Sequence, residues 1–150
     1  MRMEKPIRDT HHMRTLGQAW ISVHAPRVLL AEDDEEIRLL LAQALRRDGM
    51  EVIEARNGKE LKDFVDRGWL RDGQLQVPDL IVSDLYMPEM NGLEVLAAIR
   101  KTNAATPVIL ITAYGDEPTR AEARRLGVTA FFDKPFELAD LETAIVNLVR

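Results

Sequence analysis

Five short, mostly apolar segments alternate with five amphipathic segments, and this alternation limits the possible folds more than any other feature of the chain. Short apolar runs are typical of strands that are buried on both faces of a sheet. Such strands between amphipathic helices predict an α/β fold, with a parallel sheet covered by helices on both sides and right-handed crossovers. The predicted strands are residues 28–31, 52–55, 80–82, 107–111 and 130–132.

The helical segments are predicted from apolar residues at helical spacing. In the first helix this set follows i, i+3, i+4, i+7 and i+8 spacing, and Asp48-Gly49 ends it. Its members are Ile37, Leu40, Leu41, Ala44 and Leu45. Residues 68–78 form a predicted loop that is longer than most connections.

Composition indicates a single domain without thiol chemistry. A chain of 150 residues can bury one sizeable core, and the absence of Cys excludes disulfides and thiolate metal sites. The longest apolar run, residues 95–99, is far shorter than the roughly 20 residues of a membrane span. Residues 1–26 are predicted to be an N-terminal extension, flexible or a short added element, before a domain over residues 27–150. We expect a cytoplasmic protein without membrane insertion.

Net charge argues against a nucleic-acid partner. The chain carries a formal charge of −5, and the extension holds more basic than acidic residues, so the main body is more acidic still. A nucleic-acid-binding face needs clustered Lys and Arg side chains. We therefore expect protein partners and no nucleic acid.

Polar residues follow four of the five predicted strands. The set is Glu32, Asp33 and Asp34 after the first strand, Asp84 after the third, Thr112 after the fourth and Lys134 after the fifth. Sites in open α/β sheets form beyond the carboxyl ends of the strands, so these side chains are expected to meet. Neighbouring carboxylates repel one another and need a cation, for which Lys134 and Mg²⁺ are the candidates. A carboxylate nucleophile, a hydroxyl and an ammonium together fit phosphoryl transfer onto an aspartate.

Four stretches resemble the receiver domain of two-component response regulators, the CheY-like superfamily. They are residues 28–34 (VLLAEDD), 79–92 (DLIVSDLYMPEMNG), 107–113 (PVILITA) and 133–136 (DKPF). The resemblance covers residues 27–150 and implies a flavodoxin-like, doubly wound (βα)5 sandwich. Its five-stranded parallel sheet would have the order 2-1-3-4-5.

The resemblance also implies a role for each site residue. Asp84 corresponds to the phosphoacceptor, Asp33 to the direct Mg²⁺ ligand, and Glu32 to an acidic partner that acts through water. The backbone carbonyl of Tyr86 would complete the metal ligands, and Asp34 would be peripheral.

The remaining positions correspond to the residues that sense the phosphoryl group. Thr112 is similar to the switch hydroxyl and Lys134 to the phosphate-binding ammonium, preceding a cis bond to Pro135. Phe131 stands at the position of the mobile aromatic residue, which is often Tyr in the family. Tyr86 and Tyr114 would flank the approach of hydrolytic water, which predicts a long-lived phosphoryl group.

The leading hypothesis is a stand-alone receiver. A sensor histidine kinase or a phosphotransfer protein would phosphorylate Asp84, and the changed surface would bind a downstream target whose identity the sequence does not give. A phosphorylation-dependent dimer is compatible with this role. The protein would be no enzyme beyond its own self-catalysed phosphorylation and dephosphorylation.

Two alternatives have different chemistry. A haloacid-dehalogenase-type phosphatase also uses a nucleophilic Asp, but it needs a second Asp two residues later, where this chain has Tyr86. A pseudo-receiver would be a binding module that works without phosphorylation. The complete set Asp33, Asp84, Thr112 and Lys134 counts against it.

Overall fold

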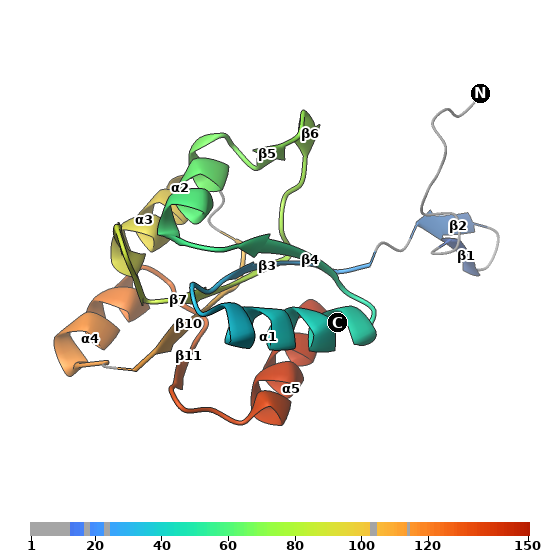
Figure 1. Ribbon diagram of the computed structural model, residues 1–150. Coiled ribbons are helices and arrows are strands. Elements are labelled where there is room, and N and C mark those ends of the chain that lie inside the picture. The colour runs from blue at the N-terminus through green and yellow to red at the C-terminus, as the bar shows by residue number, and fades with distance from the viewer. Residues whose placement is uncertain (1–12, 17–18, 23–24, 103–104, 114) are drawn as a thin grey trace.

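A five-stranded parallel sheet forms the centre of the domain (Figure 1). The computed structural model describes residues 13–16, 19–22, 25–102, 105–113 and 115–150. The sheet strands are β3 (Arg27–Ala31), β4 (Glu51–Ala55), β7 (Leu80–Asp84), β10 (Val108–Thr112) and β11 (Ala130–Asp133). Their spatial order is β11-β10-β7-β3-β4, which confirms the predicted 2-1-3-4-5 order read from the opposite edge.

Helices cover both faces of the sheet, as the alternating pattern predicted. They are α1 (Glu35–Arg47), α2 (Gly58–Asp66), α3 (Gly92–Thr102), α4 (Glu117–Arg125) and α5 (Leu138–Val149). Figure 1 shows α1 and α5 on one face, and α2, α3 and α4 on the other. Each face buries its own apolar cluster, because the strands are apolar on both sides.

Side-chain caps fix where three helices begin. Asp34, Asn57 and Asp116 each accept a hydrogen bond from the backbone N–H three residues later, at 2.8–3.1 Å. Such caps satisfy donors that the first helical turn leaves without a partner. Gly127 follows α4 with φ of +84°, as expected of a glycine that ends a helix.

The buried face of α1 differs from the predicted one. Leu40 was expected to face the core, but it is 55% exposed. The predicted residues Leu41, Ala44 and Leu45 are buried, but Arg38 and Ala42 are buried as well. The inward face is therefore turned slightly from the predicted one. A charged residue therefore occupies the first position of the inward face.

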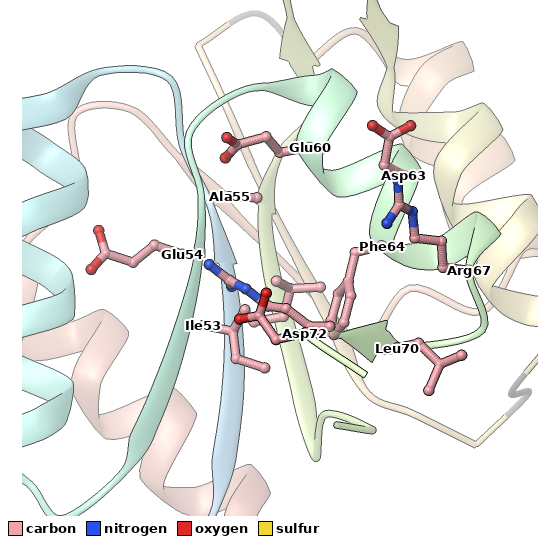
Figure 2. A pocket seen from close by; sticks show the side chains of 11 residues that line it. Ile53, Glu54, Ala55, Glu60, Asp63, Phe64, Arg67, Leu70 and Asp72 are labelled. Atoms are coloured by element: carbon pink, nitrogen blue, oxygen red, sulfur yellow. The ribbon is translucent and has the colours of Figure 1, made fainter. Parts of the chain in front are cut away.

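Residues 68–78, predicted to be a loop, contain a small hairpin. Strands β5 (Leu70–Arg71) and β6 (Gln74–Leu75) pair across a turn in which Asp72 and Gly73 both have positive φ. Trp69 holds the hairpin against the domain, since its ring is buried edge-on to Phe64 with centroids 5.5 Å apart. A cavity of about 240 Å³ lies between β4, α2 and this hairpin (Figure 2).

Two further strand pairs complete the described structure. Strands β8 (Tyr86–Met87) and β9 (Met90–Asn91) form a short antiparallel pair between β7 and α3. Strands β1 (Met13–Leu16) and β2 (Ala19–Ser22) pair with each other, and the other residues of 1–24 lie outside the described structure. None of the described helices has the length and apolar character needed to span a membrane.

Candidate functional site

Three acidic side chains meet where β3 and β7 end. Glu32 follows β3 directly, Asp33 comes next, and Asp84 is the last residue of β7. One carboxylate oxygen from each lies within 4.8 Å of the others. Glu32 and Asp84 are buried, whereas Asp33 is exposed. The structure thus brings together the acids that the sequence placed at neighbouring strand ends.

Lys134 supplies the positive charge beside these acids. Its Nζ lies 3.0 Å from Oδ1 of Asp84 and 3.2 Å from Oε1 of Glu32. The backbone N–H of Lys134 donates to the carbonyl of Thr112 at 2.9 Å, which ties the residue to the end of β10. The Lys134–Pro135 bond is cis, as the resemblance implied.

Burial controls the protonation of Asp84. Desolvation, followed by the hydrogen bond and charge of Glu32, raises the pKa of Asp84 from 3.8 to about 8 despite the opposing effect of Lys134. Desolvation by itself would lower the pKa of Lys134, but contacts with Asp84 and Glu32 raise it instead. Without a further cation, the site therefore favours a proton on Asp84 near neutral pH and a charged Lys134.

The donor set fits a hard divalent cation. Both carboxylate oxygens of Asp84 and Oε1 of Glu32 are buried. Lys134 forms an ion pair with Oδ1 of Asp84 and Oε1 of Glu32, whereas Oδ2 of Asp84 has no hydrogen-bond or ion-pair partner among the described residues. Buried acceptors without donors are costly, and oxygen ligands of this kind suit Mg²⁺. Glu32, Asp33 and Asp84 are the residues that would hold the ion. The contribution of the Tyr86 carbonyl remains a prediction.

The predicted switch residues lie on β10, which is paired with β7, and on the edge strand β11 beyond it. Thr112 is buried at the end of β10, and its neighbour Ile111 pairs in register with Asp84. Phe131 lies on β11 and is partly buried. The Arg120 guanidinium lies 4.9 Å from the centre of its ring, a cation–π contact.

The predicted water barrier consists of Tyr86 and Tyr114. Tyr86 lies on β8 and is 50% exposed. Tyr114 lies outside the described residues. A long phosphoryl lifetime therefore stays a prediction.

Two buried polar residues beside the site, Ser83 and Arg38, were not predicted to belong to it. Ser83 is buried, and its hydroxyl donates to the carbonyl of Asp84 at 2.9 Å. Arg38 is also buried, and it donates to the carbonyl of Glu32 at 3.1 Å. A signal for Arg38 was present, because extending the stripe of Leu41, Ala42 and Leu45 back by one turn reaches it. Ser83 had no comparable signal.

Comparison with known proteins identifies the family of this chain. The family model of the response regulator receiver domain matches residues 28–146. The chain therefore belongs to the receiver domain family of response regulators.

The curated relatives differ in how much of their own length this chain matches. The transcriptional regulatory protein CpxR of Escherichia coli is 35% identical over 83% of this chain and 49% of its own length. The sporulation initiation phosphotransferase F of Bacillus subtilis is 29% identical over 79% of this chain and 90% of its own length. The chain thus spans about half the length of CpxR and most of the sporulation protein.

Solved structures share the fold. The non-phosphorylated receiver domain of HemR from Leptospira biflexa has a TM-score of 0.71 and 29% identity, covering 83% of this chain and 94% of that one. The chemotaxis response regulator CheY4 of Vibrio cholerae has a TM-score of 0.69 and 27% identity, covering 83% and 99%. Both similarities extend over the sheet and its helices rather than over one motif.

Replacing the two exposed acids should separate their roles. We expect Asp33→Asn to weaken Mg²⁺ binding by about tenfold or more, because a direct carboxylate ligand is lost. Asp34→Asn should have a much smaller effect, since the Asp34 side chain caps α1 by accepting the N–H of Ile37. Amide chemical shifts followed through a Mg²⁺ titration measure both affinities. The reverse ranking would show that the metal-ligating pair is assigned one residue too early.

Proposed function

We propose that this receiver takes a phosphoryl group onto Asp84 in a Mg²⁺-dependent reaction with a sensor histidine kinase or a phosphotransfer protein. The observation that carries the proposal is the position of Asp84, whose buried carboxylate lies 3.0 Å from Lys134 and within one metal-sized cluster with Glu32 and Asp33. The same residues are suited to self-catalysis from small phosphoryl donors. In this role the protein transmits a signal and is no enzyme toward other substrates.

The chemistry is an in-line displacement at phosphorus. A carboxylate oxygen of Asp84 forms the new bond to phosphorus, while the bond to the donor histidine nitrogen breaks and its electron pair stays on the imidazole. Asp84 must be ionised for this attack. A bound divalent cation would supply charge that lowers the pKa of Asp84 and neutralises phosphoryl oxygens. Lys134 is placed to pair with one of those oxygens through a charge-assisted hydrogen bond.

The phosphoryl group would then change a surface that binds another protein. It adds charge and acceptor oxygens at the ends of β7 and β10, next to the buried hydroxyl of Thr112. Movement of Thr112 toward the phosphoryl group would be transmitted to Phe131 on the adjacent strand. A phosphorylation-dependent dimer through the altered surface is part of the same proposal.

The relatives inform the choice of partners. The name of the Bacillus protein describes a phosphotransferase, which supports a phosphorelay partner for this chain. CpxR is named a transcriptional regulator, so the relatives do not support the exclusion of nucleic acid that the acidic charge suggested. Location in the cytoplasm is consistent with the proposal.

Incubation with acetyl phosphate and Mg²⁺ tests this function. The wild-type protein should gain one phosphoryl group by intact-mass measurement, and Asp84→Asn should gain none. Omission of Mg²⁺ should reduce labelling of the wild type by at least tenfold. Equal labelling of both proteins would exclude Asp84 as the acceptor, and no labelling of folded wild type would favour the pseudo-receiver.

Lys134→Ala should separate phosphorylation from the structural response. We expect some phosphorylation to continue, because the nucleophile and the acidic residues remain. The phosphoryl group on Asp84 would, however, lack the ammonium of Lys134 as a partner for its negative charge. The variant should fold, since the apolar core supplies most of the stability. Amide shifts after addition of beryllofluoride, a phosphoryl mimic, would report the response. Wild-type-like shifts that reach Phe131 in the variant would rule out this role.

A further inference from the structure

We propose that Arg38, which is no metal ligand, is a positioning residue that holds the acidic segment 32–34 in the geometry needed to bind a divalent cation. The inference rests on the proposed function, because Arg38 is assigned to hold the metal-binding segment of the same site in place. Arg38 lies in the first half of α1 and faces the sheet, with its side chain only 7% exposed. A buried guanidinium requires partners for its donors, and those partners define its role.

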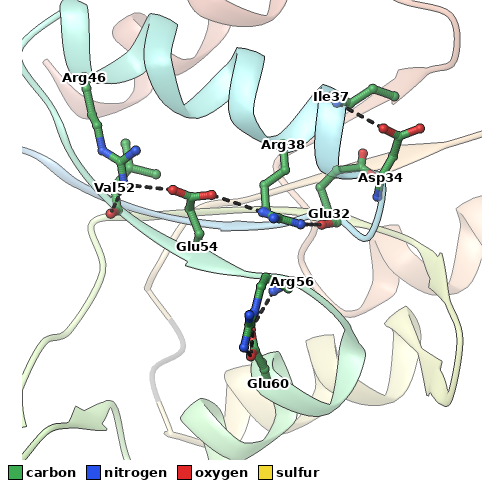
Figure 3. Close-up of polar contacts among 9 residues, drawn as sticks. All are labelled: Glu32, Asp34, Ile37, Arg38, Arg46, Val52, Glu54, Arg56 and Glu60. Atoms are coloured by element: carbon green, nitrogen blue, oxygen red, sulfur yellow. Dashed lines mark hydrogen bonds and ion pairs between the residues drawn. The ribbon is translucent and has the colours of Figure 1, made fainter.

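Arg38 joins the acidic segment to the edge of the sheet (Figure 3). Its Nη1 donates to the backbone carbonyl of Glu32 at 3.1 Å, and its Nε donates to Oε1 of Glu54 at 3.0 Å. Glu54 lies on the edge strand β4 and also pairs with Arg46 from the last turn of α1, at 3.0 Å. Arg46 in turn donates to the carbonyl of Val52 at 3.1 Å.

The contact with Glu32 acts on the peptide bond between two of the proposed ligands. The carbonyl of Glu32 and the nitrogen of Asp33 belong to one planar peptide group, so holding the oxygen fixes the plane from which Asp33 projects. The N–H of Glu32 donates to the carbonyl of Ala55 at 3.2 Å, and its Oε2 accepts from the N–H of Asp34 at 3.0 Å. Arg38 thus provides the contact that orients the segment at its centre.

Glu54 determines which group Arg38 contacts. The described contacts of the Arg38 side chain are with the Glu32 carbonyl and the Glu54 carboxylate, and none is with the carboxylates of Glu32 or Asp33. The Glu54 carboxylate accepts from Nε and so fixes the orientation of the planar guanidinium, in which Nη1 points to the Glu32 carbonyl. The positive charge is therefore paired away from the metal-binding oxygens, and it does not occupy the place of the cation.

A charge effect and a positioning effect predict opposite results. If Arg38 acted only through its charge, its removal would strengthen Mg²⁺ binding, because a nearby cation repels the ion. If Arg38 positions the segment, its removal weakens binding even though a repulsive charge is lost. Arg38→Lys adds a second distinction, because lysine keeps the charge but lacks the planar fork that reaches two acceptors in different directions.

The experiment compares four variants with the wild type. They are Arg38→Gln, Arg38→Lys, Glu54→Gln and the control Arg56→Lys. Arg56 belongs to an exposed ion pair with Glu60 near the same edge, with Nη2 2.7 Å from Oε2, and it has no described contact with residues 32–34 (Figure 3). Amide chemical shifts give both the fold of each protein and its Mg²⁺ dissociation constant.

We expect Arg38→Gln to weaken Mg²⁺ binding by about tenfold, Arg38→Lys by several-fold and Glu54→Gln by less. Arg56→Lys should match the wild type. In the absence of metal, the amide signals of Asp33 and Asp34 should already shift in both Arg38 variants and stay unchanged in the control.

Other results would contradict either the positioning role of Arg38 or the proposed function. Wild-type affinity in Arg38→Lys, together with wild-type or tighter binding in folded Arg38→Gln, would overturn the positioning role. If Arg38→Gln does not fold, wild-type Mg²⁺ affinity in Arg38→Lys is enough by itself to overturn the positioning role. A wild-type protein that binds no Mg²⁺ would instead contradict the proposed function, and the metal-free amide shifts would then test the Arg38 contact separately.

Discussion

Asp84→Asn is expected to stabilise the metal-free protein by about 2–5 kcal/mol at pH 8, and by little at pH 4. Folding raises the pKa of Asp84 from 3.8 to about 8, so the folded state binds more protons than the unfolded state between these values. The stability contributed by this group therefore falls as pH rises from about 4 to about 8 and is constant above. Asparagine removes the titration while keeping the shape of the side chain.

Urea unfolding at both pH values measures this difference. Asp33→Asn is the matched control, because Asp33 belongs to the same cluster but is exposed, so its replacement should change the free energy of unfolding much less. Excess Mg²⁺ should reduce the advantage of Asp84→Asn, since the ion stabilises only a folded state that can bind it. If Asp84→Asn were destabilising at pH 8, burial would not be the dominant influence on this carboxylate.

Mg²⁺ binding should weaken by up to tenfold for each pH unit below about 8. Metal ligands must be deprotonated, and the pKa of about 8 means that protons compete with the ion at Asp84 throughout the neutral range. Binding near pH 6 should therefore be up to about a hundredfold weaker than binding above pH 8. Binding should also release a proton at neutral pH.

Calorimetric or spectroscopic titration at several pH values tests this dependence. Proton release is obtained by repeating the titration in buffers with different ionisation enthalpies. Asp84→Asn should bind Mg²⁺ weakly and with little dependence on pH in this range. An affinity for the wild type that is constant from pH 6 to pH 9 would show that Asp84 is already ionised in the metal-free site.

The sheet and the principal acids were predictable because each depends on a local signal. The apolar strands and helical stripes define the alternating order of the fold, and parallel strands place their carboxyl ends at one edge. Asp84 and Lys134 could therefore be assigned to one site before their separation of 3.0 Å was known. The resemblance added their roles and the cis bond before Pro135, which composition and spacing do not indicate.

Other features depend on contacts between distant segments. Leu40 fits one apolar stripe of α1, and the stripe of Leu41, Ala42 and Leu45 is a second one that leads back to Arg38. Packing against the sheet selects the second stripe and leaves Leu40 55% exposed. Trp69 is buried because a hairpin turns back over Phe64, an arrangement that a Gly-containing loop does not specify. The pairing of Arg38 with Glu54 joins a helix to an edge strand, so sequence spacing carries no direct sign of it.

The location of the phosphoryl group tests the central claim most directly. Borohydride reduces an aspartyl phosphate to homoserine, so peptide mass spectrometry after reaction with acetyl phosphate and Mg²⁺ identifies the residue that was modified. We expect homoserine at position 84 in the wild-type protein and at no other aspartate position. Homoserine in place of Asp33 or Asp34, with Asp84 unmodified, would contradict it.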